Sequence, residues 1–436
     1  MNIGRAVFAV SLLAVSTLGT PRGFSAGRDL EVIRSFEWVN GLSLNSLETR
    51  HLNRDNDILG LSDGNATSEM RPNLKMIHED DLFLIARPRF RLTVDHVHRK
   101  ELDDTTSGDG EAIWNELFGL WRVSGALIVA YGIHNFQWGP GELISPSNRM
   151  FHENVFDKNA FYEPEGKNLV RANFSIGRQF SAIFLGEVRE NGESKEAPFG
   201  YQEAFDKKAL LKLEYARSQG ASHIGVVGGG GEVTKPWTGI YGLYELNDDW
   251  AIYTDTCFQR GSRAYYPEEP LPGVTTFSQR WVESKRFFTL ALSGIRYNLE
   301  SGGDIKFEHL FNESGYTNEE YDIGVRAVDI STPTPEPAGA QGLALFLNPG
   351  LEFIKRNYLF LAGRFPDLGS DKKFTFYLRY LFCTEDASQR ALAQLDWDYS
   401  NHGSYFASLI INTGADHAEF ARLTKGTLLT GYKYNW

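Results

Sequence analysis

The last ten residues of the chain read Thr427-Leu-Leu-Thr-Gly-Tyr-Lys-Tyr-Asn-Trp436. Because side chains alternate between the two faces of a strand, one face carries Leu428, Thr430, Tyr432, Tyr434 and Trp436. That face is apolar and ends in three aromatic rings, whereas the opposite face is mostly polar. Aromatic rings gather where a membrane meets water. The pattern therefore favours a strand that enters a bilayer over the edge strand of a soluble sheet.

The first 26 residues have the features of a secretion signal. Arg5 supplies a positive charge, Val7 to Val15 is an apolar core interrupted by one Ser, and Ser25-Ala26 is a plausible cleavage site. The apolar core is too short to cross a membrane, and no later stretch approaches the roughly 18 unbroken apolar residues that a spanning helix needs. The sequence therefore predicts an exported chain without membrane helices.

The dominant period of the remaining sequence is two, which is typical of strands. From Leu82 to Val97, apolar residues alternate with Arg87, Arg89, Arg91 and further polar side chains. The same alternation predicts strands over 112–123, 126–137, 169–176, 178–188, 208–217, 221–230, 236–246, 250–260, 285–298 and 304–313. The pattern blurs beyond residue 313, where we expect strands over 321–330, 342–353, 357–365, 374–383, 389–399 and 404–413 before the closing strand.

The connections between these strands alternate in length. Short turns at 124–125, near 177, and at 218–220, 247–249 and 299–303 alternate with longer connections at 98–111, 138–168, 189–207, 231–235 and 261–284. Outer-membrane barrels are threaded in this way, with short periplasmic turns and long outer loops. We therefore predict an all-β fold, a transmembrane antiparallel β-barrel of about 18 strands, with about 16 as the second choice.

The prediction divides the chain into a signal peptide (1–26), an N-terminal segment (27–81) and an outer-membrane β-barrel (82–436). The N-terminal segment would hold either the first strands or a periplasmic extension. We expect the protein in the outer membrane of a Gram-negative bacterium, in contact with lipid and lipopolysaccharide. The formal net charge of −12 argues against nucleic acid as a partner. Side chains cannot fill so wide a barrel, so its lumen should hold water or loops.

A column of arginines is the first candidate for chemistry. Arg87, Arg89 and Arg91 share the polar face of one predicted strand, about 7 Å from one to the next. Cations in such a column are too costly to face lipid, so they should face the lumen. There they would either line a path for anions or form ordinary ion pairs with inward acids such as Glu116. Three further residues complete the predicted lumen and solute-binding set, namely Arg171, Arg379 and His134.

The second candidate is the stretch after the strand at 126–137. It contains a Trp-Gly-Pro turn followed by Ser-Pro-Ser-Asn, and its predicted constriction-loop motif is Trp138, Gly139, Pro140, Ser145, Pro146 and Asn148. The residues that follow include Met150, Phe151 and Phe161, which are too apolar for a loop in water. We expect this loop to fold into the barrel mouth and to narrow a pore there.

The same motif carries a resemblance to known barrels. Gly132 and His134 at a strand end, then Trp138-Gly139 and Ser145-Pro146-x-Asn148, resemble porin-type outer-membrane barrels related to alginate-export porins and to the capsule-assembly surface lectin barrel. The closing residues also resemble the C-terminal signal of such barrels, which implies contact of Tyr432, Tyr434 and Trp436 with the barrel-assembly machinery.

The wide lumen predicts a channel for passive passage of small, anionic or sugar-like solutes. The capsule-assembly resemblance implies an alternative, a loop-plugged surface barrel that binds a polysaccharide during capsule or exopolysaccharide assembly or export. A homo-oligomer stays open in both cases. A membrane-embedded hydrolase is the third hypothesis, but nothing in the sequence places Ser145 within reach of His134. We expect no enzyme activity, cofactor or metal. The spacing of Cys257 and Cys383 does not decide whether they are bonded.

Overall fold

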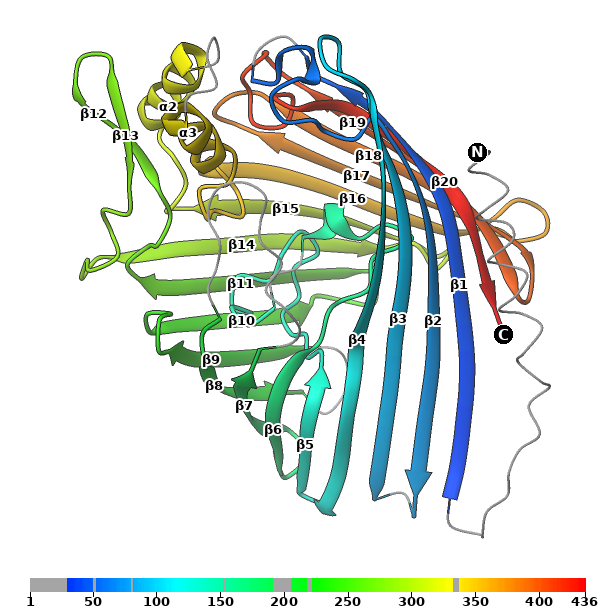
Figure 1. The fold of residues 1–436 in the computed structure, drawn as a ribbon. Coiled ribbons are helices and arrows are strands. Elements are labelled where there is room, and N and C mark those ends of the chain that lie inside the picture. Colours follow the sequence, from blue (N-terminus) through cyan, green and yellow to red (C-terminus); the bar gives the residue numbers. More distant parts are fainter. Residues whose placement is uncertain are drawn as a thin grey trace.

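The computed structural model describes residues 30–49, 52–79, 81–151, 154–190, 205–217, 222–331 and 337–436. The predicted signal peptide, residues 1–26, lies outside the described residues. Eighteen strands form one antiparallel sheet that closes on itself (Figure 1). Closure occurs because β1 (Leu30–Leu47) pairs with both β2 (Gly64–His78) and β20 (Thr424–Asn435). The prediction of an antiparallel barrel with 18 strands is confirmed.

The remaining barrel strands follow in chain order, each paired with its neighbours. They are β3 (Leu82–Val97), β4 (Thr105–Ser124), β5 (Leu127–His134), β6 (Lys167–Ile176), β7 (Phe180–Arg189), β8 (Lys208–Ala216), β9 (His223–Gly231), β10 (Trp237–Glu245), β11 (Trp250–Arg260), β14 (Phe287–Asn298), β15 (Asp304–Asn312), β16 (Asn357–Leu368), β17 (Phe374–Cys383), β18 (Gln389–Ser400) and β19 (Gly403–Thr413).

Six short elements are not part of the barrel wall. They are the hairpin β12 (Tyr266–Leu271) and β13 (Val274–Ser278), the helices α2 (Asn318–Ser331) and α3 (Pro337–Leu347), and the turns η1 (Arg54–Asn56) and η2 (Val155–Asp157). The hairpin and the two α-helices stand together above one end of the barrel (Figure 1). None of the described helices is both long enough and apolar enough to cross a membrane.

The strand count is correct, but two of the predicted strands are wrong. Residues 321–330 lie in α2, and residues 342–347 of the predicted strand at 342–353 lie in α3. The start of α2 is a capping box, because the Glu320 amide donates to Thr317 Oγ1 (3.1 Å) and Glu320 accepts from the Thr317 amide (2.7 Å). The α3 sequence is rich in the helix formers Ala and Leu. The two strands that replace them, β1 and β2, lie in the segment 27–81.

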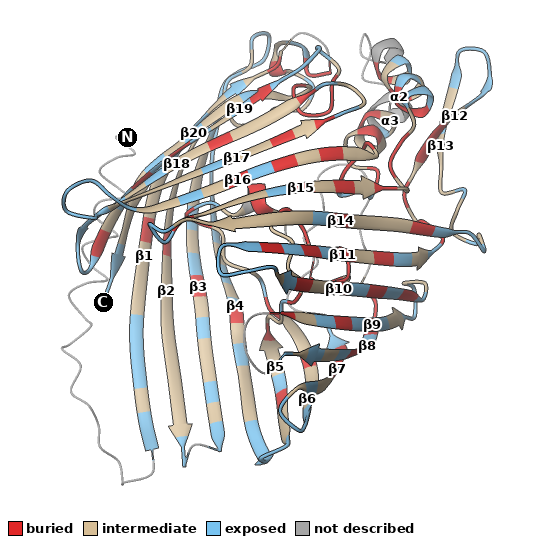
Figure 2. Ribbon diagram, turned by 180° about the vertical axis from the view of Figure 1, so that it is seen from behind, coloured by how far each residue is buried: buried red, intermediate tan, exposed pale blue. Residues whose placement is uncertain are grey.

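The strands present alternating faces to the outside and the inside of the barrel. Figure 2 shows this alternation along β11, where exposed positions alternate with the buried Ala251, Tyr253, Asp255 and Cys257. Outward positions elsewhere are large and apolar and stay exposed, including Leu42, Leu84, Phe90, Leu409 and Leu428. The outside is therefore an apolar surface, whereas polar and charged side chains gather inside.

The two ends of the barrel differ in their connections. Short turns join β2 to β3, β4 to β5 and β18 to β19 at one end, where Phe36 and Trp436 also exchange backbone hydrogen bonds (2.9 Å each). The long connections lie at the other end and include the α2–α3 and β12–β13 segments. One of them, residues 135–166 between β5 and β6, turns into the barrel; we call it the inner loop.

Candidate functional site: the inner loop and the lumen wall

The inner loop buries its apolar side chains against the inside of the wall. Leu143, Ile144 and Phe156 pack with residues of β11, β14, β15 and β16. Trp138 and Met150 pack with residues of β6 to β10. At the far side, Phe161 contacts the Phe406 ring edge to face, at 6.1 Å between centroids. The loop therefore touches the wall on several sides of the lumen, which accounts for its apolar composition.

Two buried wall carboxylates hold the first half of the loop. Asp255 on β11 accepts a hydrogen bond from the Ser147 amide, and Ser145 Oγ donates to it (2.7 Å each). Glu308 on β15 accepts from the Glu142 and Leu143 amides at 2.7 and 2.9 Å. A buried carboxylate is costly unless hydrogen bonds compensate the loss of water. The loop amides supply those bonds, so loop and wall satisfy each other.

The predicted motif residues form one tight turn within this half. Trp138 Nε1 donates to Ser147 Oγ (3.1 Å), and Asn148 accepts from the Phe151 amide (3.1 Å). Gly139 has a φ of +93°, and a Cβ there would lie 2.2 Å from Ser145 Oγ, so only glycine fits. Pro140 and Pro146 lie in the same turn, in a stretch without helix or strand. The motif positions the loop, and its role toward a solute stays a prediction.

The second half of the loop meets a cluster of arginines and glutamates on β2 and β3. Glu69 is fully buried, and its carboxylate lies 2.5 Å from Arg71 Nε and 2.7 Å from both Arg89 Nε and Arg91 Nε. Arg71 and Arg89 also donate to the Phe161 carbonyl, at 2.9 and 2.8 Å. We call Glu37, Glu69, Arg71, Arg89, Arg91 and Glu163 the lumen cluster.

The predicted arginine column therefore faces the lumen, but its members are paired. Arg87 forms an ion pair with Glu116 (2.6 Å), the inward acid predicted from the sequence. Arg89 is almost completely buried, whereas Arg87 and Arg91 keep 44% and 28% of their side chains exposed. This geometry matches the ion-pair alternative more closely than an open ladder of cations.

The other predicted lumen residues lie apart from this column. Arg171 on β6 packs its guanidinium over the Phe136 ring, 5.0 Å from the centroid. Arg379 on β17 donates to the Val155 and Lys158 carbonyls of the inner loop at 3.2 Å each. His134 is fully buried, with Nδ1 3.1 Å from the Gly132 carbonyl. Two of the three thus contact the inner loop, and the role of all three toward a solute stays a prediction.

Two cavities flank the second half of the loop. The first, of about 750 Å³, lies toward the long connections and is lined by Arg91, Phe161 and Glu163 among others. The second, of about 340 Å³, lies toward the short turns and is lined by Arg71, Arg87 and Glu163. Glu163 borders both cavities, and its carboxylate lies 3.5 Å from Arg71, which lines the second cavity.

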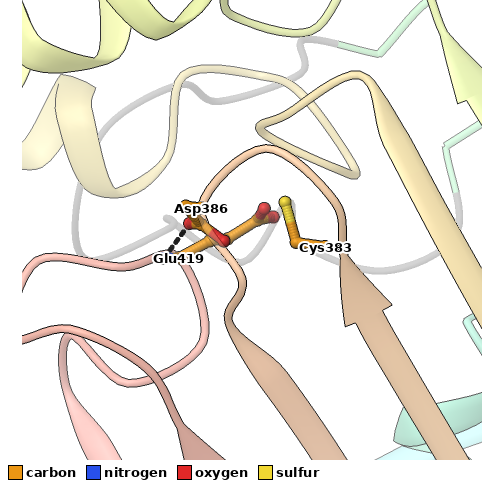
Figure 3. Close-up of side chains that lie close together, drawn as sticks. All are labelled: Cys383, Asp386 and Glu419. Atoms are coloured by element: carbon orange, nitrogen blue, oxygen red, sulfur yellow. Dashed lines mark hydrogen bonds between the residues drawn. The ribbon is translucent and has the colours of Figure 1, made fainter.

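A separate cluster lies at the long-connection end. The ligand atoms of Cys383, Asp386 and Glu419 lie within 4.8 Å of one another (Figure 3). Glu419 accepts from Tyr358 Oη (2.6 Å) and the Ile354 amide (3.0 Å), while Asp386 accepts from the Glu419 amide (2.8 Å). Because protein donors already satisfy these oxygens, we assign the cluster the structural role of tying two connections together. Cys257 and Cys383 are both free and buried.

A Gly-x-Ser-x-Gly sequence at Gly60 to Gly64 lacks the features of a catalytic elbow. Such an elbow joins a strand to a helix, whereas this segment leads into β2. The ring of His96 pairs with Asp63 (2.9 Å), but Ser62 Oγ donates to the Gly64 and His96 carbonyls instead of the ring. Among the residues that the structure describes, the serine therefore has no hydrogen bond to a base that would activate it.

Comparison with known proteins supports the fold. No protein-family model matches the chain, and no curated protein matches its sequence. Acinetobacter baumannii OccAB1 aligns over 96% of this chain and 99% of its own, with 9% identity and a TM-score of 0.54. Pseudomonas aeruginosa OccK5 (OpdH) aligns over 93% and 98%, with 11% identity and a TM-score of 0.52. OccK7 (OpdD) of the same species aligns over 93% and 98%, with 10% identity and a TM-score of 0.52.

At such low identity these likenesses establish the fold and transfer no residue role. The resemblance to alginate-export porins and to the capsule-assembly lectin barrel stays a prediction.

Proposed function

We propose that the protein is an outer-membrane channel in which the inner loop sets the width and the lumen cluster sets the charge preference. One observation carries the proposal. The inner loop lies inside a closed barrel and leaves a cavity on each side, with Glu163 bordering both. A solute that passed from one cavity to the other would pass the Arg71–Glu163 pair. Selection would then act through diameter and electrostatics, with no covalent step.

The outer surface supports a place in a membrane. Its apolar strand positions suit lipid, and an aromatic group at the short-turn end suits the lipid–water boundary. In that group Tyr432 lies 5.8 Å from Trp38 and 6.4 Å from Tyr405, measured between ring centroids. The structural neighbours OccAB1, OccK5 and OccK7 are outer-membrane channels, which adds support from the fold alone.

The partly exposed arginines of the lumen suggest the kind of solute. Arg87 and Arg91 offer partly exposed guanidinium groups to the two cavities, and such groups bind carboxylates, phosphates and hydroxyls. Phe151, Phe161 and Tyr162 line the first cavity and supply flat apolar faces. We infer that the solutes are small and anionic or sugar-like. Such solutes would pass the carboxylate of Glu163, which borders both cavities.

Planar-bilayer recordings test the proposal. The refolded protein should give stable conductance steps, and deletion of residues 141–160 should enlarge them because the loop occupies the lumen. Shortening the β12–β13 hairpin, which lies outside the barrel wall, is the control and should leave the step size unchanged. Equal steps after both deletions would refute the role of the inner loop.

A matched pair of arginine variants tests charge selection. Arg87→Gln should shift the reversal potential in a salt gradient toward cations, because it removes an exposed lumen cation. Arg326→Gln is the control, since Arg326 is similarly exposed and paired with Glu269 but lies on α2 outside the barrel. Equal reversal potentials for both variants would contradict the role of Arg87.

The polysaccharide-binding barrel remains a second candidate because the inner loop is bonded to so much of the wall. Asp255, Glu308, Arg379, Arg71 and Arg89 all hold it. A loop fixed in this way would act as a plug. Folded protein that gives no conductance steps but retains a labelled acidic polysaccharide would favour this candidate over the channel.

A further inference from the structure

A third cavity, of about 350 Å³, lies at the long-connection end of the barrel. Its lining comes from separate parts of the chain. Arg149 belongs to the inner loop, Arg263 to the connection after β11, Lys208 to the start of β8, and Asn348 to the residues after α3. Met150, the neighbour of Arg149, lines the first cavity instead. The inner loop therefore borders all three cavities: Arg149 lines the third, Met150 the first, and Glu163 the first and the second.

The arginines of this cavity differ from those of the lumen cluster. Within the described part of the chain, neither Arg149 nor Arg263 forms a salt bridge or a side-chain hydrogen bond, and Arg263 Nε is enclosed without a partner. By contrast, Arg71, Arg89 and Arg91 converge on Glu69. Lys208 adds a third positive charge and lies near Asp206. Glu352 is the acidic residue of the lining.

Both arginines are partly buried, and burying a polar nitrogen such as Arg263 Nε without a partner is costly, because its lost water is not replaced. A ligand with negatively charged oxygens would offset that cost through forked hydrogen bonds. Arg149 and Arg263 enter from different elements, which suits a group whose oxygens point in several directions. A tetrahedral phosphate has such oxygens, whereas a carboxylate presents two oxygens in one plane. Ser314, Thr289 and Asn348 provide further polar groups in the lining.

We propose that this cavity binds the phosphate group of a small solute at the outer end of the lumen. The role of this cavity as a loading site rests on the proposed channel function, whereas its binding of phosphate does not. Solute held at Arg149 would sit beside the inner loop, on the side of the barrel from which the first cavity is reached. Arg149 and Arg263 would then recognise the anion first, and the solute would pass the ion-paired lumen cluster afterwards.

Calorimetric titration of the folded full-length protein with inorganic phosphate at low salt tests the site. We expect saturable binding, and Arg149→Gln and Arg263→Gln should each weaken it about tenfold through loss of charge-assisted bonds. Arg326→Gln, a paired surface arginine, is the matched control and should bind like the wild type. Absence of saturable binding, equal binding by the double variant, or tighter binding of succinate than of phosphate would overturn the proposal.

A second measurement needs no variant. Phenylglyoxal labels arginines, and phosphate should protect Arg149 and Arg263 from it while Arg326 stays reactive; equal labelling with and without phosphate would overturn the site. Conductance keeps the two proposals apart. Stable conductance steps without phosphate binding would refute the phosphate site but not the channel. Phosphate binding without conductance steps would refute the channel but not the phosphate site.

Discussion

Replacing Glu69 with Gln tests the electrostatic centre of the lumen most directly. The Glu69 carboxylate has no exposed surface and contacts Arg71, Arg89 and Arg91 at 2.5 to 2.7 Å. Gln keeps the shape but removes the charge. Removing one partner of a buried ion pair costs about 3–5 kcal/mol, because the remaining charges lose their compensation. Arg71 keeps Glu37 at 2.5 Å, so we expect the lower end, about 3 kcal/mol.

Two assays check this expectation. Unfolding in urea, followed by the heat-dependent gel shift, should show the loss of stability, and the reversal potential should move toward anions because the lumen gains one net positive charge. Glu283→Gln is the control: Glu283 is 86% exposed and pairs with Lys235 at the surface. A surface pair contributes less than about 1 kcal/mol, so this variant should stay near the wild type. If Glu69→Gln unfolded and conducted like Glu283→Gln, our account of the cluster would be wrong.

Three further predictions concern the loop and the barrel seam. Asp255→Asn should lower the free energy of unfolding by about 1–3 kcal/mol, because the Asn amide group would face a loop donor such as the Ser147 amide. The loosened loop should also raise the noise of the open-channel current. Current traces identical to those of the wild type would contradict the role of Asp255 in holding the loop. Burial raises the pKa of the Glu163 carboxyl, so its charge is lost at a higher pH than usual. Acidification should therefore shift selectivity toward anions, and Glu163→Gln should remove that part of the shift. Gly431→Ala should impair barrel assembly, because the new Cβ would lie 1.9 Å from a backbone oxygen of β1. Gly228→Ala is the control and should assemble normally, because the nearest atom to a Cβ at that position is 4.0 Å away.

The barrel was predictable because its signals are local. Alternation and turn length depend on neighbouring residues, and the structure keeps most of the strands that they indicated. The errors have local causes as well. The capping box of Thr317 and Glu320 is present in the sequence and signals the start of α2. The strand β2 is less regular, since its sequence Gly64-Asn-Ala-Thr-Ser-Glu mixes polar residues on both faces.

The partners of the candidate site depend on contacts that one sequence does not reveal. Glu69 meets the arginine column because β2 pairs with β3 in a register that sets Glu69 opposite Arg91. A shift by one residue would have turned Glu69 outward. Asp255 and Glu308 reach the inner loop from strands more distant in the chain. The apolar residues of the loop predict that it lies inside the barrel, but the closed topology decides which wall it meets.

The closing strand β20 also belongs to the wall that the inner loop contacts. The strands β19, β20 and β1 form the wall on which Phe161 packs, with Val39 and Phe406 in its cluster. A Cβ at Gly41 would lie 2.8 Å from the Phe161 ring, so the missing side chain makes room for that ring. The Phe161 carbonyl in turn accepts from Arg71 and Arg89. The wall behind Phe161 exists only once β20 pairs with β1. The final position of the loop therefore depends on the seam at which β20 pairs with β1.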